Sequence, residues 1–451
     1  MKHLFFLSLV CGGTLSAVSA PANVGSAAVT QNVETRLSAE LQGLVKKNSE
    51  DFYDAAALVY DATQDVTAFA PMMKKLADRG NAAAQLWLAR FMLMQNESDT
   101  KALAVLEKAA ASKYQPAMVE YAAQCTLPGS PDARAAKGRK VLMEACRLGS
   151  AKGRALYLIV SGRFQTGSLT QPEIVSELKK KNFYLEEMIA ALQADTTSAL
   201  VWMERAAEHG SSVTPFLIWS NIPQGEKAQS YMNMALERHL PAALGHVGYQ
   251  SVLAETMRED GGDAAKTAEA FRMLAISAML NTPESIQMLA YFYANGQGGE
   301  VPKERIAELF RLAHKCGHPD GTAGLGYCMV LGAGCKQDVQ GGIALMEKAA
   351  ANGAKWVYQA MASMYFNGDG VKPDMRKAID AFAEDHLNGA RHSYAMMAVI
   401  TALGNASAKP DARAARVYLN MARENGDMEA EGLYNIFLKD GRWRFLEELL
   451  Q

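Results

Sequence analysis

The sequence has few of the residues that interrupt helices, and it has no excess of charge of one sign. Only 14 of its 451 residues are proline, whereas 49% belong to the apolar class. Low proline together with abundant alanine and methionine favours helix over sheet. Lysine and arginine number 46 against 48 aspartate and glutamate, and no run of like charges stands out. A nucleic-acid partner, which needs a basic surface, is therefore not expected.

Long apolar runs are also missing beyond the N-terminus. No later stretch stays apolar for the roughly 20 residues that a membrane-spanning helix needs, so stable membrane insertion is not expected. The first 22 residues differ: Lys2 and His3 precede an apolar stretch that starts at Leu4, and small residues close it at Ala20 and Ala22. This pattern is typical of a signal peptide cleaved after Ala22. It predicts an exported protein, periplasmic or extracellular.

Cysteines are too few to scaffold the fold. Five remain after the predicted cleavage, at positions 125, 146, 316, 328 and 335, and an odd number leaves at least one thiol free or paired between chains. Cys125 falls near the end of one expected helix and Cys146 within the next. Antiparallel helices could bring these two together as a disulfide, and the alternative is a pair of buried free thiols. Cys328 with Cys335 is a second candidate pair.

Motifs that carry chemistry are absent as well. The chain has no Gly-x-Ser-x-Gly elbow, no phosphate-binding loop and no His-Glu-x-x-His. The best metal candidate is the group His314, Cys316 and His318, three ligand types within five residues. They fall at the end of an expected helix where other repeats carry ordinary residues, which favours surface or packing roles. We therefore predict no catalytic residue, no metal site and no cofactor.

A repeat is what the sequence does contain. Segments that end at Gly317, Gly353, Gly389 and Gly426 are spaced 36, 36 and 37 residues apart. We call the residue at this position of each repeat the marker residue. Further markers in the same register lie upstream, at Gly80, Lys113, Gly149, Gly210, His239 and Asn281. A fixed period of this length is the signature of a helical solenoid.

Small residues recur at fixed distances from the markers. Alanine stands four residues before many of them, and alanine or glycine stands nine residues after; the first set is Ala109, Ala145, Ala206, Ala235, Ala313, Ala349 and Ala422. Small side chains at fixed helical positions let two helices approach closely. The marker glycine suits the end of a helix, because it adopts the left-handed conformation without steric cost. Each unit is thus predicted to be a helix, a loop, a second helix and a tight turn.

The loop within the unit carries a motif. Gly296–Gly298, Gly332–Gly334 and Gly368–Gly370 each begin fifteen residues after a marker, and the last is followed by Val371, Asp374 and Lys377-Ala378. With the closing segment Glu347-Lys348-Ala349-Ala350-Ala351-Asn352-Gly353, this pattern resembles the Sel-1-like repeats, relatives of the tetratricopeptide repeats. The resemblance implies an all-α, right-handed superhelical solenoid of antiparallel helix pairs that scaffolds a protein or peptide partner.

The pattern also suggests domain boundaries. We expect a signal peptide at 1–22, an N-terminal cap or degenerate repeat at 23–79, repeats at 80–149, an irregular region at 150–280, regular repeats at 281–440 and a C-terminal capping helix at 441–451. Gly149 and Gly210 lie 61 residues apart, too far for one unit. Pro172 looks like the first turn of a helix that runs to about Gln193, so an inserted helix is predicted there.

An aromatic row is the main candidate binding feature. Ten residues after their markers stand Tyr249, Tyr291 and Tyr327. Equivalent positions of a solenoid stack side by side, so these rings could form a ladder that binds a peptide. The alternative is that they pack between helices. The sequence therefore predicts an exported scaffold that binds a protein or peptide on its concave face. The alternative function is a cell-wall-related hydrolase or small-ligand-binding protein with its site in region 150–280.

Overall fold

The protein is helical throughout the part of the chain that the computed structural model describes, residues 27–95, 99–164, 168–258, 262–390 and 392–427. Within these residues the only β-type pairing is an isolated bridge between Asn405 and Ala408. The predicted signal peptide and the predicted C-terminal capping helix lie outside the described residues.

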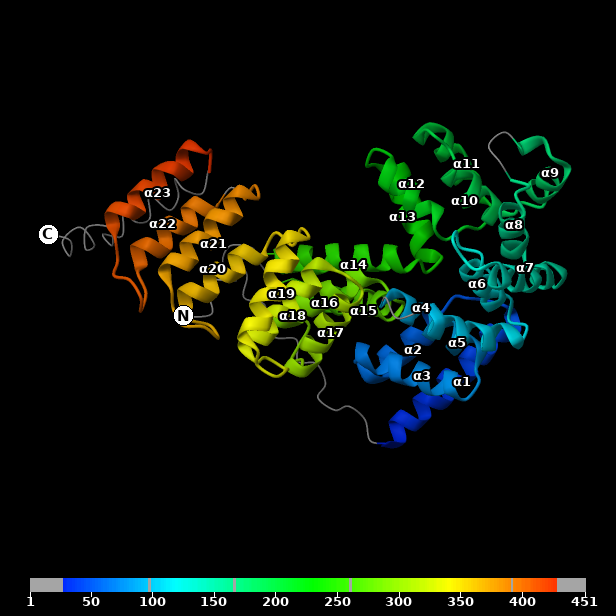
Figure 1. Ribbon diagram of the computed structural model, residues 1–451, viewed down its shortest axis with the longest axis horizontal. Coiled ribbons are helices and arrows are strands. Elements are labelled where there is room, and N and C mark those ends of the chain that lie inside the picture. Colours follow the sequence, from blue (N-terminus) through cyan, green and yellow to red (C-terminus); the bar gives the residue numbers. More distant parts are fainter. Residues whose placement is uncertain (1–26, 96–98, 165–167, 259–261, 391, 428–451) are drawn as a thin grey trace. The chain divides into compact units, whose positions relative to one another are not determined.

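The helices follow one another as antiparallel pairs, each packed against the next along the chain (Figure 1). They are α1 (Ala27–Lys47), α2 (Tyr53–Thr63), η1 (Val66–Ala68), α3 (Phe69–Asp78), α4 (Ala82–Met94), α5 (Asp99–Ala111), α6 (Gln115–Cys125), α7 (Asp132–Arg147), α8 (Ala151–Val160), η2 (Ser168–Thr170), α9 (Pro172–Lys179), α10 (Phe183–Ala191), α11 (Thr196–Glu208), α12 (Thr214–Asn221), α13 (Glu226–Glu237), α14 (Pro241–Thr256), α15 (Ala264–Met279), α16 (Pro283–Ala294), α17 (Lys303–Lys315), α18 (Pro319–Leu331), α19 (Val339–Ala351), α20 (Val357–Asn367), α21 (Met375–Leu387), α22 (Ser393–Leu403) and α23 (Ala412–Glu424). This is an all-α solenoid, as predicted.

The chain divides into two compact units. Among the described residues, the N-terminal unit lies within 27–255 and 262–289, and the C-terminal unit lies within 256–258 and 290–427. The regular repeats were expected to begin at 281, so this division falls within the first of them, inside α16.

A left-handed residue ends the second helix of every pair. Positive φ occurs at all the predicted markers, including the non-glycine residues Lys113 (63°), His239 (54°) and Asn281 (65°). At Gly149 and Gly353 the N–H of the following residue donates to the carbonyl five residues before it, at 3.0 Å in both turns. This is the hydrogen bond of a Schellman turn, and it satisfies a carbonyl that the helix end leaves free. The markers are therefore the helix stops that the sequence predicted.

The predicted inserted helix is wrong, because Lys181 is also a marker. Its φ is 56°, and the N–H of Asn182 donates to the carbonyl of Glu177 at 3.2 Å. The turn divides the expected long helix into α9 and α10, and α10 contacts α8 and α9 and pairs with α11. Pro215 likewise opens an ordinary helix, α12. The region 150–280 thus contains one more turn than predicted, at Lys181, and its markers Gly149, Lys181, Gly210, His239 and Asn281 are unevenly spaced.

Small residues bring the helices together as predicted. The seven alanines four residues before the markers are at most 1% exposed. A Cβ atom on Gly321 would lie 2.3 Å from Cβ of Ala313, so only glycine fits where α17 meets α18. The same contact is polar in another repeat, where buried Asp385 accepts a hydrogen bond from Ser393 Oγ at 2.8 Å.

An aspartate starts the second helix of several pairs. Asp263, Asp338, Asp374 and Asp411 each accept hydrogen bonds from backbone N–H groups of the first turn that follows. An N-cap of this type typically stabilises a helix by about 1 kcal/mol. The aspartate of the repeat motif is therefore a helix-start signal.

In the described residues, no helix is long and apolar enough to cross a membrane.

We expect Lys181→Gly to stabilise the N-terminal unit. A lysine held at φ 56° is strained by about 1 kcal/mol, and glycine relieves that strain. Gly353→Ala at φ 97° should lower stability by a similar amount, although its Cβ would meet no atom within 4 Å. Urea unfolding followed by circular dichroism measures both changes. A loss of stability in K181G would contradict the assignment of Lys181 as a marker.

Candidate partner-binding surfaces

The three tyrosines of the row belong to different units. Tyr249 lies in α14 of the N-terminal unit, whereas Tyr291 in α16 and Tyr327 in α18 belong to the C-terminal unit. All three side chains are half-buried, between the core and full exposure. Tyr327 packs against the core of the C-terminal unit, and burial raises its pKa to about 12. Each tyrosine thus contributes to packing and also has some accessible surface, and its role in binding stays a prediction.

A second aromatic cluster lies one helical turn from Tyr249. His246 on α14 contacts Trp219 on α12, with ring centroids 4.7 Å apart, and Trp219 stacks with Phe216 at 5.3 Å. All three are half-buried, and burial lowers the pKa of His246. Residues three apart share one face of a helix, so His246 and Tyr249 point the same way from α14. No sequence pattern indicated this cluster, because its members belong to different hairpins.

A charged cluster occupies the inner side of the N-terminal unit. Arg90 of α4 donates to the carboxylate of Glu50 and, at 3.1 Å, to Glu120 of α6, while Lys152 of α8 donates to Glu50 at 2.7 Å. Arg90, Glu120 and Lys152 come from the first helices of three successive hairpins. Their side chains converge on this cluster, as expected for the concave side of a stack of hairpins.

Electrostatics shows how strongly Glu50 is held. Its side chain is 26% exposed, and burial alone would raise its pKa. The charges of Arg90 and Lys152 outweigh burial and lower the pKa to about 2. Burial by itself would also lower the pKa of Arg90, but the facing carboxylates raise it. The cluster therefore remains ionised at neutral pH.

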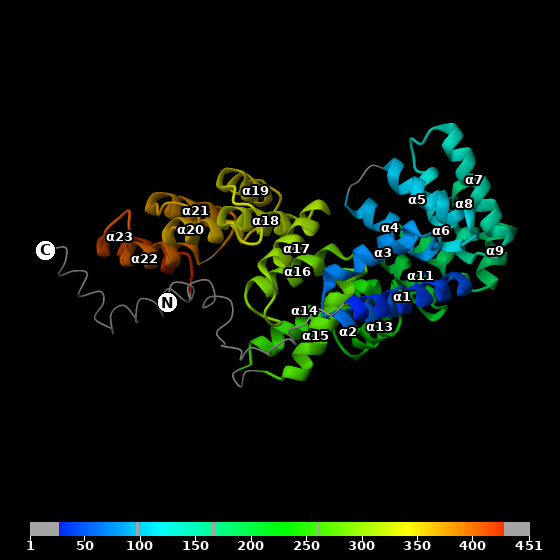
Figure 2. The ribbon, with the colours of Figure 1, turned by 90° about the horizontal axis from the view of Figure 1, so that it is seen from below.

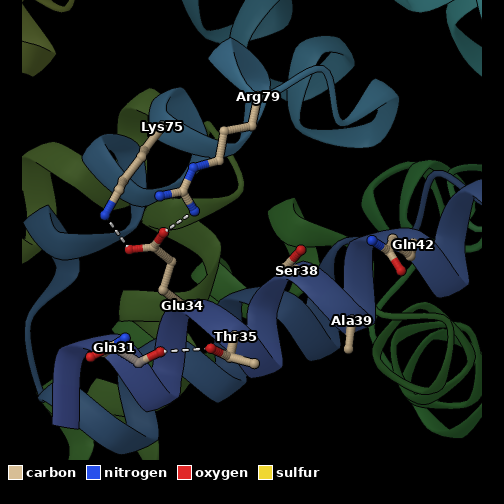
Figure 3. Close-up of a pocket in the computed structure, with 8 residues that line it drawn as sticks. All are labelled: Gln31, Glu34, Thr35, Ser38, Ala39, Gln42, Lys75 and Arg79. Atoms are coloured by element: carbon tan, nitrogen blue, oxygen red, sulfur yellow. Dashed lines mark hydrogen bonds and ion pairs between the residues drawn. The ribbon is translucent and has the colours of Figure 1, made fainter. Parts of the chain in front are cut away.

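A shallow pocket of about 770 Å³ lies between α1 and α3 (Figure 3). Glu34 bridges Lys75 and Arg79 across it, at 2.5 Å to each. The hydrogen bond from Lys75 is the main reason that the pKa of Glu34 is lowered. The remaining lining residues are Gln31, Thr35, Ser38, Ala39 and Gln42. Because both cations are already paired with a carboxylate, we assign no charged ligand to this pocket.

Cys125 and Cys146 are not brought together. A Cβ on Gly138 would lie 2.5 Å from Cβ of Cys125, so Gly138 is the residue of α7 that faces Cys125. Cys146 lies eight residues beyond Gly138, which is about 12 Å along the helix. Disulfides rarely join Cα atoms more than about 7 Å apart. Both thiols are free, and burial raises the pKa of each. The antiparallel arrangement places the two cysteines at opposite ends of the hairpin.

The cysteines of the second candidate pair are also free. Cys328 is buried and Cys335 is half-buried. Burial raises the pKa of Cys328 to about 12, and the nearby Cys335 contributes in the same direction. In the metal candidate, Nδ1 of His314 lies 3.0 Å from Oγ1 of Thr322. Burial lowers the pKa of His314. This histidine joins α17 to α18, which is the packing role that the sequence favoured.

The bounds of the hairpins agree with the bounds of the units of a known repeat family. A family model described as "Sel1 repeat" matches residues 190–211, 283–307, 319–353, 358–380 and 392–427. The matches at 283 and 319 start at the first residues of α16 and α18, and that from 319 runs to the marker Gly353. The chain belongs to the Sel1-repeat family. Sel1-repeat proteins are non-enzymatic helical scaffolds that typically mediate protein interactions, and this chain is such a scaffold.

Solved structures of other Sel1-repeat proteins are similar to this chain. One is c5321, titled a protective antigen present in uropathogenic Escherichia coli strains displaying an SLR fold, with 17% identity over 84% of this chain and 93% of that one and a TM-score of 0.38. A Sel1-repeat protein from Oxalobacter formigenes shows 23% identity over 54% and 91%, with a TM-score of 0.35. A putative one from Klebsiella pneumoniae shows 15% identity over 45% and 99%, with a TM-score of 0.32.

Proposed function

We propose that this Sel1-repeat protein is an exported scaffold that binds a protein or peptide partner through the recurring tyrosines, with Tyr291 and Tyr327 forming the binding surface within the C-terminal unit. The observation that carries the proposal is the half-burial of Tyr249, Tyr291 and Tyr327 at one repeat position. Tyrosine offers a large contact area with a polar tip and is enriched where proteins bind one another. A ring that packs on one side and is accessible on the other is already ordered, so binding costs it little side-chain entropy.

Part of the concave side is occupied by charged groups that already have partners. In the N-terminal unit it is lined by the Glu50 cluster, in which each charge already has a partner. A partner would therefore use the Tyr249 end of the row together with Trp219 and His246, or the repeats that carry Tyr291 and Tyr327. Export of the chain rests on the sequence pattern of residues 1–22 alone.

The hydrolase alternative is set aside, because the chain belongs to a family of non-enzymatic scaffolds. The aromatic cluster of Phe216, Trp219 and His246 lies in the region where that alternative placed its site. We assign this cluster to the partner surface instead, since it continues the face of α14 that carries Tyr249.

Site-specific photo-crosslinking tests the proposal. A photoreactive phenylalanine analogue replaces Tyr291 or Tyr327 in the full chain, which is then irradiated in an envelope extract. We expect the same protein to be crosslinked at both positions, because both rings contact one partner. The crosslink at either position should be lost when the tyrosine at the other position is changed to serine. The crosslinked species is identified by mass spectrometry.

Tyr358 supplies the control. It is also half-buried, but it lies five residues after its marker and therefore outside the row. The analogue at this position should give no crosslink, and Y358S should leave the crosslinks at the row intact. Equal crosslinking at position 358, or retention of the partner by a Y291S/Y327S variant, would refute the row as the binding surface.

A further inference from the structure

A five-residue connector, Asn48–Phe52, joins α1 to α2 and, together with Tyr53 at the start of α2, lies on the concave side of the N-terminal unit. Three of its residues contact the first hairpins of the unit. Asn48 Oδ1 accepts from the backbone N–H of Gln115 at 3.1 Å, the Tyr114 hydroxyl donates to the carbonyl of Ser49, and Glu50 binds Arg90 and Lys152. These contacts come from α4, the start of α6, and α8.

Asp51 and Tyr53 contact the last hairpins of the same unit. Asp51 Oδ2 lies 3.0 Å from Nδ1 of His239, and the His239 ring stacks on Tyr53 with centroids 4.0 Å apart and planes 10° apart. Arg272 of α15 donates to the Tyr53 hydroxyl at 3.4 Å. The connector therefore links helices separated by about half of the chain, and α2 lies against α15 (Figure 2).

The contacts have the pattern of peptide recognition. A main-chain carbonyl and a side-chain amide are bound by hydrogen bonds, two consecutive acids face Arg90, Lys152 and His239, and the aromatic residue that follows is stacked. Helical-repeat proteins use their concave surfaces for binding. We propose that the concave surface of the N-terminal unit is a recognition site for a short acidic segment followed by an aromatic residue, and that the chain's own residues 48–53 occupy it.

The connector competes with any partner in trans. Covalent attachment gives it an effective concentration in the millimolar range, so a free peptide of the same chemistry binds only when the internal contact is weakened. This second site is built from residues other than the tyrosine row, so it stands or fails independently of the proposed function.

The test is a peptide-binding measurement on the full chain. The ligand is a fluorescently labelled synthetic peptide with the sequence of residues 46–55, Lys-Lys-Asn-Ser-Glu-Asp-Phe-Tyr-Asp-Ala. The E50Q/D51N variant loses the charges of the connector and keeps its size. By fluorescence anisotropy we expect this variant to bind the peptide at least about tenfold more tightly than the wild-type chain does, because its site is less strongly occupied.

Two controls separate recognition from a general change of charge. Asp54 is exposed in the first turn of α2 and lies outside these contacts, so D54N should bind the peptide as weakly as the wild type. A peptide that itself carries E50Q and D51N should lose the tighter binding to the variant chain. Variant chains that retain wild-type circular dichroism yet bind the peptide no better than the wild type would overturn the proposal.

If the E50Q/D51N variant does not fold, hydrogen exchange on the wild-type chain tests whether the connector can be displaced from the concave surface. Millimolar unlabelled peptide, acetylated so that its mass differs, should displace the connector and speed amide exchange in residues 48–53 severalfold. Exchange in α18 and α19 of the C-terminal unit should stay unchanged. No acceleration at residues 48–53 would show that the connector is an inseparable part of the fold and would overturn the proposal.

Discussion

Gly342→Ala is expected to destabilise the C-terminal unit by about 2 kcal/mol, although alanine normally stabilises a helix relative to glycine. Gly342 lies where α19 crosses α18. A Cβ atom at this position would lie 2.6 Å from the carbonyl oxygen of Gly326 and 2.9 Å from the backbone nitrogen of Val330. Both are backbone atoms of the facing helix, so rotation of a side chain cannot relieve the clash. The two helices must move apart and lose part of their packing, which thermal and urea unfolding would report.

The matched control is the same substitution in α1. Gly43 is also helical, but a Cβ there would meet no atom within 4 Å. Gly43→Ala should therefore stabilise the N-terminal unit by about 0.5–1 kcal/mol, through helix propensity alone. Opposite signs for the two changes identify close helix approach as the cause. A neutral or stabilising Gly342→Ala would show that α18 and α19 can accommodate a Cβ atom where they cross. That result would contradict this account of the small-residue pattern.

Arg90→Met should destabilise the N-terminal unit by about 3–5 kcal/mol, the usual result of removing one partner from a largely buried ion pair. The change leaves Glu50 and Glu120 facing each other with only Lys152 to compensate. Methionine keeps most of the volume of the arginine stem, so loss of charge rather than a cavity dominates. Urea unfolding with a spectroscopic probe in the N-terminal unit measures the effect.

Lys137→Met is the control for Arg90→Met. Lys137 pairs with Glu107 at 2.6 Å, but the two side chains are 53% and 52% exposed. Exposed pairs contribute little, so the expected loss is much smaller than that of Arg90→Met. Similar losses in both variants would show that the Glu50 cluster is no more than a surface ion pair.

The Glu50 cluster also predicts acid sensitivity. The pKa of Glu50 is about 2 in the folded chain and 4.5 in its ordinary state. A lowered pKa contributes stability that is fully present above pH 4.5 and is lost as the pH falls toward 2. The contribution is about 3 kcal/mol, by the relation between pKa shift and free energy. The free energy of unfolding, measured from pH 6 down to about pH 2, should thus fall less steeply with pH in E50Q than in the wild type. An identical slope in the two proteins would contradict the lowered pKa.

Local sequence patterns predicted the repeats because each depends on one residue and its near neighbours. A glycine at a helix end, an alanine four residues earlier and a Gly-x-Gly loop each reflect a steric requirement within one hairpin. Lys181 was missed for the same reason, since a lysine in the left-handed conformation looks like any helical lysine. The error turned two helices into one predicted insertion.

The sequence by itself determined the helical class, the position of most turns and the small residues at which helices meet. The tertiary structure alone decided which distant residues face one another. Cys125 and Cys146 lie on consecutive helices but at opposite ends of the antiparallel pair. Asp51 and His239, in contrast, are 188 residues apart in the sequence and are in contact. The physical reason is that a repeat pattern encodes the fit of each hairpin to the next. The curvature that accumulates over many hairpins brings the connector and the concave surface together, and no single repeat records it.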